Sequence, residues 1–333
     1  MKKLTKLFAG VLAMTMALTG CAGGNSASDS AADNNADSYK IGVIQFAAHP
    51  SLDNCYNGIV QGLDESKISY TVDLQNGNAD SATCDSIAQN MVANGYDVIF
   101  AIATPAALSA YSAVQGTDIP VIFCAVSDPV AAGLTASFDA GNKNCIGTSD
   151  VLDLDAQVNL IRAMQPDVKK IGVLYTTTEA NSVSQLAQLK EVAANYGIEI
   201  VEQGVSGAAD IPQAATSVAG QVDCINNFTD NNVVNNLSVL LEAANAANVP
   251  VYGSEEEQVK NGCIASISID YVALGKTTAE IGVKVLNGAK AEEMPVGTIS
   301  DGTPVVNTDV MAQFRIELPA GYENADKVTT NAE

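Results

Sequence analysis

Two stretches of this sequence repeat one another: Tyr-Lys-Ile-Gly-Val-Ile-Gln-Phe at 39–46 and Lys-Lys-Ile-Gly-Val-Leu-Tyr-Thr at 169–176. Each is a short apolar run typical of a buried strand, and each is followed by a helical pattern, at about 52–65 and 182–196. Further matching runs follow in both copies, which are offset by roughly 126–130 residues. Because strands and helices alternate, the sequence predicts an α/β protein of two similar doubly wound lobes with parallel sheets.

The composition of the chain limits its partners. Of 333 residues, 47% are hydrophobic, which is enough for two domain cores, and the formal net charge is −22. Such an acidic chain is unsuited to nucleic acids, which bind through Lys and Arg, and it is repelled by anionic membrane surfaces. With one His in the sequence, a His-rich metal site is excluded. We expect neither a metal nor a cofactor.

The first twenty residues have the pattern of a secretion signal. Three Lys within the first six residues precede an apolar run at 7–18 that is short for a membrane span. Small residues then precede Cys21, as in a bacterial lipobox, which predicts lipidation of this Cys; an ordinary secretory signal is the alternative. The composition of residues 21–38 is typical of a flexible tether. We therefore expect the chain to face the extracytoplasmic side of the cell membrane, held there by the lipid anchor alone.

Six further Cys follow Cys21, with no C-x-x-C pair among them. Four of them lie in apolar, strand-like runs, where a Cys is usually a small buried hydrophobe. We favour free buried thiols, although the extracytoplasmic compartment permits disulfides and pairing of Cys55 with Cys84 stays open.

Polar residues and helix-start signals follow almost every predicted strand, such as His-Pro-Ser at 49–51 and Thr-Pro-Ala at 104–106. Each can be explained as helix capping. However, open parallel sheets bind ligands at the carboxyl ends of their strands, and here two sets of ends would face each other. Free N–H groups at helix starts suit a carboxylate, while Asp128, Glu179 and Asp230 suit an ammonium. The cleft is therefore complementary to a zwitterion.

Several stretches together resemble the lipoprotein substrate-binding subunits of ABC importers, in the branch that binds aromatic amino acids. They include Ile-Gly-Val-Ile-Gln at 41–45, His-Pro-Ser-Leu-Asp at 49–53, Val-Ser-Asp-Pro at 126–129, Gly-Thr-Ser-Asp at 147–150 and Asp-Tyr-Val-Ala-Leu-Gly at 270–275. The resemblance covers most of 39–325 and implies a type I periplasmic-binding-protein fold with three hinge crossings. We place lobe 1 at 39–147 plus 271–303, lobe 2 at 148–270 plus 304–325, and a tail at 326–333.

The strand ends and the resemblance together give the expected ligand-binding residues. These are Gln45, Phe46, Ser51, Thr104, Pro105, Ala106, Ser127, Asp128, Thr148, Ser149, Tyr175, Glu179, Asn181, Asn227, Thr229, Asp230, Tyr252 and Asp270. The hypothesis assigns the ligand carboxylate to the helix start at 104–106 with Ser51, and the ammonium to Asp128 and Asp230. Tyr175 and its neighbours pack on the ligand side chain.

We expect the chain to capture a free amino acid, in particular tyrosine, phenylalanine or tryptophan, between closing lobes. As a monomer, it would deliver this ligand to ABC permease subunits. A branched-chain amino acid, a nucleoside or a sugar is the alternative ligand, and a surface adhesin or sensor receptor is the alternative role. Catalysis is not expected, because no acid–base pair or activated nucleophile is recognisable.

Overall fold

The computed structural model describes residues 38–299 and 302–331, so the predicted signal, Cys21 and all but the last residue of the predicted tether lie outside the described residues. The first lobe contains β1 (Tyr39–Gln45), α1 (Pro50–Ser66), β2 (Tyr70–Asn76), α2 (Ser81–Ala93), β3 (Val98–Ile102), α3 (Thr104–Ala113), β4 (Val121–Cys124), β5 (Cys145–Ser149), α10 (Tyr271–Leu286), η2 (Ala291–Glu293) and β11 (Gly297–Thr298). The second lobe contains α4 (Leu154–Met164), β6 (Lys170–Thr176), α5 (Ala180–Asn195), β7 (Glu199–Val205), η1 (Ala208–Asp210), α6 (Ile211–Ala219), β8 (Cys224–Asn226), α7 (Asn231–Asn235), α8 (Leu237–Ala246), β9 (Val251–Tyr252), α9 (Glu256–Lys260), β10 (Ala265–Ser268), β12 (Thr303–Asn307), α11 (Thr308–Phe314) and β13 (Asp326–Val328).

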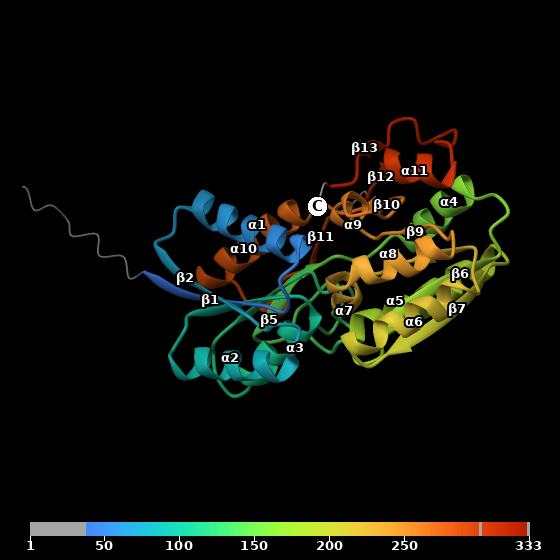
Figure 1. The fold of residues 1–333 in the computed structure, drawn as a ribbon. Helices are drawn as coiled ribbons and strands as arrows, with labels where there is room; N and C mark the ends of the chain where they lie inside the picture. The colour runs from blue at the N-terminus through green and yellow to red at the C-terminus, as the bar shows by residue number, and fades with distance from the viewer. Residues whose placement is uncertain (1–37, 300–301, 332–333) are drawn as a thin grey trace, which may run out of the picture. The chain divides into compact units, whose positions relative to one another are not determined.

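Each lobe is built on a parallel sheet. The strand order is β11-β5-β4-β3-β1-β2 in the first lobe and β7-β6-β8-β9 in the second, so both copies place their second strand outside their first. In the first lobe α1 and α10 lie together over one face of the sheet, and α2 and α3 lie over the other (Figure 1). The predicted α/β class with parallel sheets is confirmed. A small third sheet, β10-β12-β13, adds an antiparallel β10–β12 pair that the sequence did not predict.

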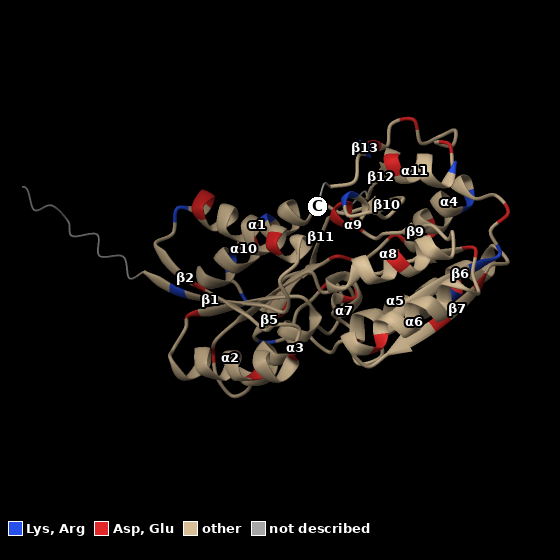
Figure 2. Cartoon of the chain, viewed as in Figure 1, with Lys and Arg blue, Asp and Glu red and all other residues tan. Residues whose placement is uncertain are grey.

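The two lobes have separate hydrophobic cores. The first lobe has one cluster of buried residues, from 41–146 and 271–296. The second lobe has two, one from 154–267 and 306–325 and the other from 174–263 with Val305. The helix α10 returns to the first lobe by packing closely on α1. A Cβ atom added at Gly58 would lie 2.2 Å from the carbonyl oxygen of Val272, so this contact requires glycine. Figure 2 shows Asp and Glu spread over elements of both lobes, among fewer Lys and Arg.

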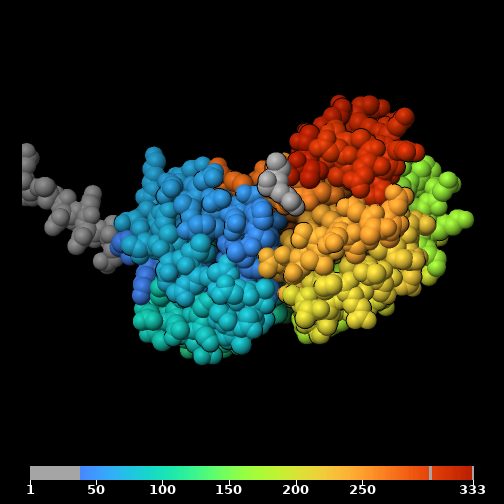
Figure 3. All heavy atoms as spheres, viewed as in Figure 1, coloured from blue at the N-terminus to red at the C-terminus, as the bar shows by residue number. Residues whose placement is uncertain are grey.

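The lobes touch through side chains that follow their strands. The hydroxyl groups of Ser127 and Thr229 lie 3.4 Å apart, and Ser184 in α5 donates a hydrogen bond of 2.6 Å to Asp128. In Figure 3 the blue and teal residues of the first lobe meet the yellow and orange residues of the second on the face that is shown. The structure therefore has the lobes in contact at the carboxyl ends of their sheets.

Two further expectations concern the described residues. The six Cys among them are all buried free thiols, Cys55 and Cys84 included, as the sequence analysis favoured. Between residues 38 and 331, apart from 300–301, no helix combines the length and apolar character needed to cross a membrane.

Candidate functional site

A small cavity of about 20 Å³, on the scale of one or two water molecules, lies between the strand ends of the two lobes. Its lining consists of His49, Ser51, Leu52, Ala103, Thr104, Ala125, Ser127, Asp150, Asn181, Thr229, Asn231, Val234, Glu255, Gln258 and Tyr271. Both lobes contribute to this lining, so a ligand held there would connect them.

Two helices begin at the cavity without a capping side chain. His49 precedes α1 and Ala103 precedes α3, and neither side chain accepts a hydrogen bond from the first turn. The first-turn N–H groups and the positive ends of both helix dipoles therefore remain available to an anion. Such an arrangement suits a carboxylate, as the sequence analysis expected for Ser51 and Thr104.

The backbone is strained at two lining residues. Ala103 and Ala125 have φ angles of 78° and 55°, in the region that favours glycine. Strain of this kind persists where the surroundings enforce it, often at binding sites. Alanine is small enough to let the backbone at the ends of β3 and β4 approach a ligand closely.

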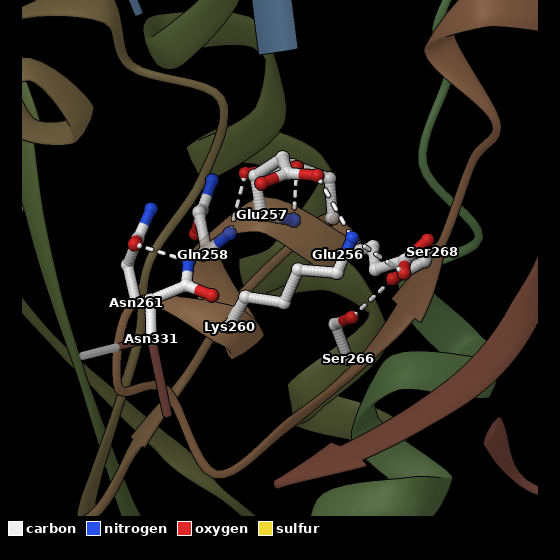
Figure 4. Close-up of polar contacts among 9 residues, drawn as sticks. Glu256, Glu257, Gln258, Lys260, Asn261, Ser266, Ser268 and Asn331 are labelled. Carbon is white, nitrogen blue, oxygen red and sulfur yellow. Dashed lines mark hydrogen bonds and ion pairs between the residues drawn. The ribbon is translucent and has the colours of Figure 1, made fainter. Parts of the chain in front are cut away.

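The charged residues that line the cavity are acidic. Asp150 follows β5 and is 2% exposed, and Glu255 precedes α9 and is also 2% exposed. The lining residues of the described chain include no Lys or Arg. Lys260, at the end of α9, is paired with Glu256 at 2.8 Å and Glu257 at 3.0 Å (Figure 4). The cavity therefore favours a ligand that brings its own positive charge.

Several polar atoms around the cavity have no hydrogen-bond partner. They are both ring nitrogens of His49, the Oγ1 of Thr104, the Oδ1 of Asp150 and the Oδ1 of Asn181, and all four residues line the cavity. Buried polar groups are normally paired, because an unpaired group costs about 1–3 kcal/mol. This concentration of donors and acceptors is what a polar ligand would satisfy.

The two acidic lining residues differ in how many of their carboxylate oxygens accept hydrogen bonds. The hydroxyl of Tyr271 donates a hydrogen bond of 2.8 Å to Oδ2 of Asp150, which leaves Oδ1 free. Both oxygens of Glu255 accept backbone hydrogen bonds from α9, from Glu257 at 2.7 Å and Gln258 at 2.8 Å. Asp150 is thus the lining carboxylate with a spare acceptor.

Burial changes the pKa of the titratable groups at the site. It raises the pKa of Asp150 above its ordinary value and that of Glu255 to about 7. Burial and the neighbouring Asp230 raise the pKa of Glu179 to about 7. Burial lowers the pKa of His49 to about 4, so its imidazole is neutral at neutral pH.

These pKa values predict how the stability of the ligand-free protein changes with pH. Glu255 ionises near 4.5 when exposed and near 7 when folded, so its contribution to stability is present below pH 4.5 and is lost as the pH rises through 7. The raised pKa of Glu179 changes the stability in the same direction. The depressed pKa of His49 has the opposite effect, because protonation of His49 below pH 6.5 favours the unfolded state. We expect the free energy of unfolding to be higher at pH 5 than at pH 7.5, by about 2 kcal/mol for Glu255 alone.

Urea denaturation at pH 5, 6, 7 and 7.5 measures this dependence. The variant Glu255→Gln should show a flatter profile, and His49→Phe should show a steeper one. A Glu255→Gln profile parallel to that of the parent protein would contradict the assignment.

The structure brings five of the eighteen expected ligand-binding residues to the cavity lining: Ser51, Thr104, Ser127, Asn181 and Thr229. The residues outside the lining are Gln45, Phe46, Pro105, Ala106, Asp128, Thr148, Ser149, Tyr175, Glu179, Asn227, Asp230, Tyr252 and Asp270. Many of these polar groups have internal partners: for example, Thr148 pairs with Thr278 at 2.6 Å, and Tyr252 donates to Gln165 at 3.0 Å.

Asp230 differs most from its expected role. One of its oxygens accepts from the backbone N–H of Val233 at 3.0 Å and from the hydroxyl of Thr176 at 2.8 Å. The other accepts from the N–H of Thr176 at 2.6 Å and from the hydroxyl of Ser182 at 2.7 Å. With both oxygens engaged inside the second lobe, Asp230 caps α7 and fixes it to β6.

Asp150, Glu255 and His49 line the cavity but were not among the expected ligand-binding residues. The sequence did contain an indication that Asp150 belongs to the site, because Asp150 directly follows the buried strand β5. The expected residues follow their own strands in the same way. The indication for Glu255 was weaker, because it rested only on a predicted helix start. Nothing local shows that both oxygens of Asp230 are engaged, because three of its four hydrogen bonds come from Thr176 and Ser182, which are distant in sequence.

The comparisons with known proteins agree with this fold. The family model for the ABC transporter substrate binding protein matches residues 40–328, and the chain belongs to this family. Proteins of this family bind small-molecule ligands outside the cytoplasm and work with ABC permeases, so the chain is a binding protein and not an enzyme.

Particular relatives are similar over most of the chain. A "Tyrosine-binding protein" of Clostridioides difficile (strain R20291) is 37% identical over 81% of this chain and 79% of its own length. A Streptococcus pneumoniae ABC domain solved in complex with L-Trp is 34% identical, with a TM-score of 0.84 over 87% of this chain and 99% of that one. The ligand-free, open structure of a Clostridium difficile substrate-binding protein with adhesive properties is 36% identical, with a TM-score of 0.67 over 88% and 100%. The predicted type I periplasmic-binding-protein fold is therefore confirmed.

Proposed function

We propose that this protein captures a free aromatic amino acid, with tyrosine as the first candidate, for an ABC importer. The observation that carries the proposal is a cavity lined both by a buried acid with a free oxygen, Asp150, and by the uncapped start of α3. An α-amino acid offers one ammonium and one carboxylate to these two groups.

The head group of the ligand binds to the first lobe in this proposal. Its ammonium pairs with the free Oδ1 of Asp150, and its carboxylate accepts hydrogen bonds from Thr104 and the first turns of α3 and α1. The unpaired hydroxyl of Thr104 and the lack of Lys and Arg in the lining support this orientation.

The aromatic ring extends towards the second lobe. Leu52 and Tyr271 offer apolar contacts on the first lobe, and Val234 offers one on the second. The tyrosine-binding relative and the relative in complex with L-Trp, each about a third identical to this chain, support an aromatic side chain.

Binding is proposed to proceed by closure of the lobes. At similar sequence identity, this structure is more similar to the complex with L-Trp than to the ligand-free, open relative, with TM-scores of 0.84 and 0.67. That difference and the Ser127–Thr229 contact support a closed conformation here. A ligand that contacts both lobes binds this conformation better and shifts the population towards it.

The location at the membrane and the domain organisation are part of the same proposal. The signal peptide at 1–20 would be removed before Cys21, and the lipid on Cys21 would hold the protein at the membrane. The protein would act there as a monomer. The lobes would comprise 39–147 plus 271–303 and 148–270 plus 304–325, with hinge motion at the three crossings between them.

Calorimetry of the ligand-stripped protein tests the proposal. We expect binding of at least one of L-tyrosine, L-tryptophan and L-phenylalanine, and no binding of ribose or adenosine. Tyramine lacks the carboxylate and N-acetyl-L-tyrosine lacks the ammonium, so each should bind at least tenfold more weakly than L-tyrosine. A protein that binds a sugar or nucleoside and none of the three amino acids would refute the proposed function.

A further inference from the structure

The side chain of Asn181 is held in one orientation. Its Nδ2 shares two N–H donors among three acceptors, which are Oε2 of Glu179 at 3.2 Å, Oγ of Ser182 at 3.3 Å and the carbonyl oxygen of Thr229 at 3.3 Å. Its Oδ1 is buried and has no partner, although the residue lines the cavity and is 3% exposed. Asn181 therefore has one unused acceptor, Oδ1, in a residue that lines the cavity.

The reversed orientation of this amide is unfavourable. It would turn Oδ1 towards the carbonyl of Thr229 and towards Oε2 of Glu179, an oxygen that already accepts two hydrogen bonds from Asn231. Glu179 itself is fixed, because it accepts hydrogen bonds from Asn231 at 2.7 Å and 3.1 Å and from Asn232 at 3.2 Å. The network thus determines which atom of the Asn181 amide is free.

An acceptor without a partner selects for a donor. The hydroxyl of a phenol and the N–H of an indole can donate to it, whereas an unsubstituted phenyl ring cannot. Asn181 belongs to the second lobe, towards which the ring extends if the head group is held by Asp150 and Thr104.

We infer that Asn181 is a specificity-determining residue that favours aromatic ligands carrying a hydrogen-bond donor on the ring over phenylalanine. The inference rests on the proposed function, since it requires an aromatic amino acid in this cavity. A ligand without the donor would leave the buried acceptor unpaired, and we expect it to bind about 10- to 100-fold more weakly.

A ligand series on the wild-type protein is the first test. L-tyrosine and 4-amino-L-phenylalanine carry a donor on the ring, while L-phenylalanine and 4-fluoro-L-phenylalanine do not and are of similar size. Calorimetry at pH 8 should show tighter binding for the first two by about 10- to 100-fold. Equal affinity for tyrosine and phenylalanine would overturn the inference and leave the proposed function intact. If none of the four binds, the proposed function and the inference both fail.

The variant Asn181→Leu is the second test, since it removes the acceptor at similar side-chain volume. The affinity for tyrosine should fall to that for phenylalanine, while the affinity for phenylalanine stays within about threefold. Gln185→Leu is the matched control: Gln185 is a buried amide on the same helix, also with a free Oε1, but it does not line the cavity. Its tyrosine-to-phenylalanine ratio should remain that of the parent. If Asn181→Leu does not fold, the ligand series decides.

Discussion

Replacing Asp150 by Asn is expected to remove most of the ligand affinity and to leave the fold intact. The carboxylate is buried, and among residues 38–299 and 302–331 its Oδ1 has no partner and no Lys or Arg joins it in the cavity lining. Loss of one partner of a buried charge pair costs about 2–5 kcal/mol, which corresponds to a roughly 30- to 5,000-fold weaker binding of the amino acid.

The stability of the ligand-free Asp150→Asn variant should equal or exceed that of the parent. Burial raises the pKa of Asp150, so the charged form is costly in the fold, and an amide oxygen can still accept the hydrogen bond from Tyr271. Asp139→Asn is the control, since Asp139 is an exposed residue of the same lobe outside the cavity lining. Calorimetry and thermal denaturation measure both quantities. Tyrosine binding by Asp150→Asn within threefold of the parent would exclude Asp150 as the ammonium partner.

Replacing Asp230 by Ala is expected to have the opposite effect, a large loss of stability. The substitution leaves two backbone N–H groups and two hydroxyls without their acceptor at a site with no exposure to solvent. Each unpaired buried group costs about 1–3 kcal/mol, so we expect a loss of at least about 3 kcal/mol in the free energy of unfolding.

Urea denaturation of Asp230→Ala beside Asp270→Ala provides the measurement. Asp270 caps α10 at an exposed position, where loss of the cap costs about 1 kcal/mol. The sequence-based hypothesis, in which Asp230 holds the ammonium, predicts instead a stable variant that has lost its ligand affinity. The substitutions at 150 and 230 therefore distinguish a residue that binds the ligand, whose loss lowers the affinity, from a residue that caps a helix, whose loss lowers the stability.

Much of the architecture could be predicted from local pattern. The apolar runs at 39–46 and 169–176 mark buried parallel strands, and the offset between them implies two lobes of the same topology. The antiparallel β10–β12 pair was not predictable in this way, because its strands belong to segments more than thirty residues apart that cross between the lobes.

The sequence by itself determined the repeat, the α/β class, and the general position of the site at the strand ends, because hydrophobic periodicity and helix-start chemistry are local properties. The tertiary structure alone decided which acid remains available. Asp150 and Asp230 both follow buried strands, yet Thr176 and Ser182 engage Asp230 from over forty residues away, while Oδ1 of Asp150 stays unpaired. Whether a side chain caps a helix or binds a ligand depends on partners that the fold supplies.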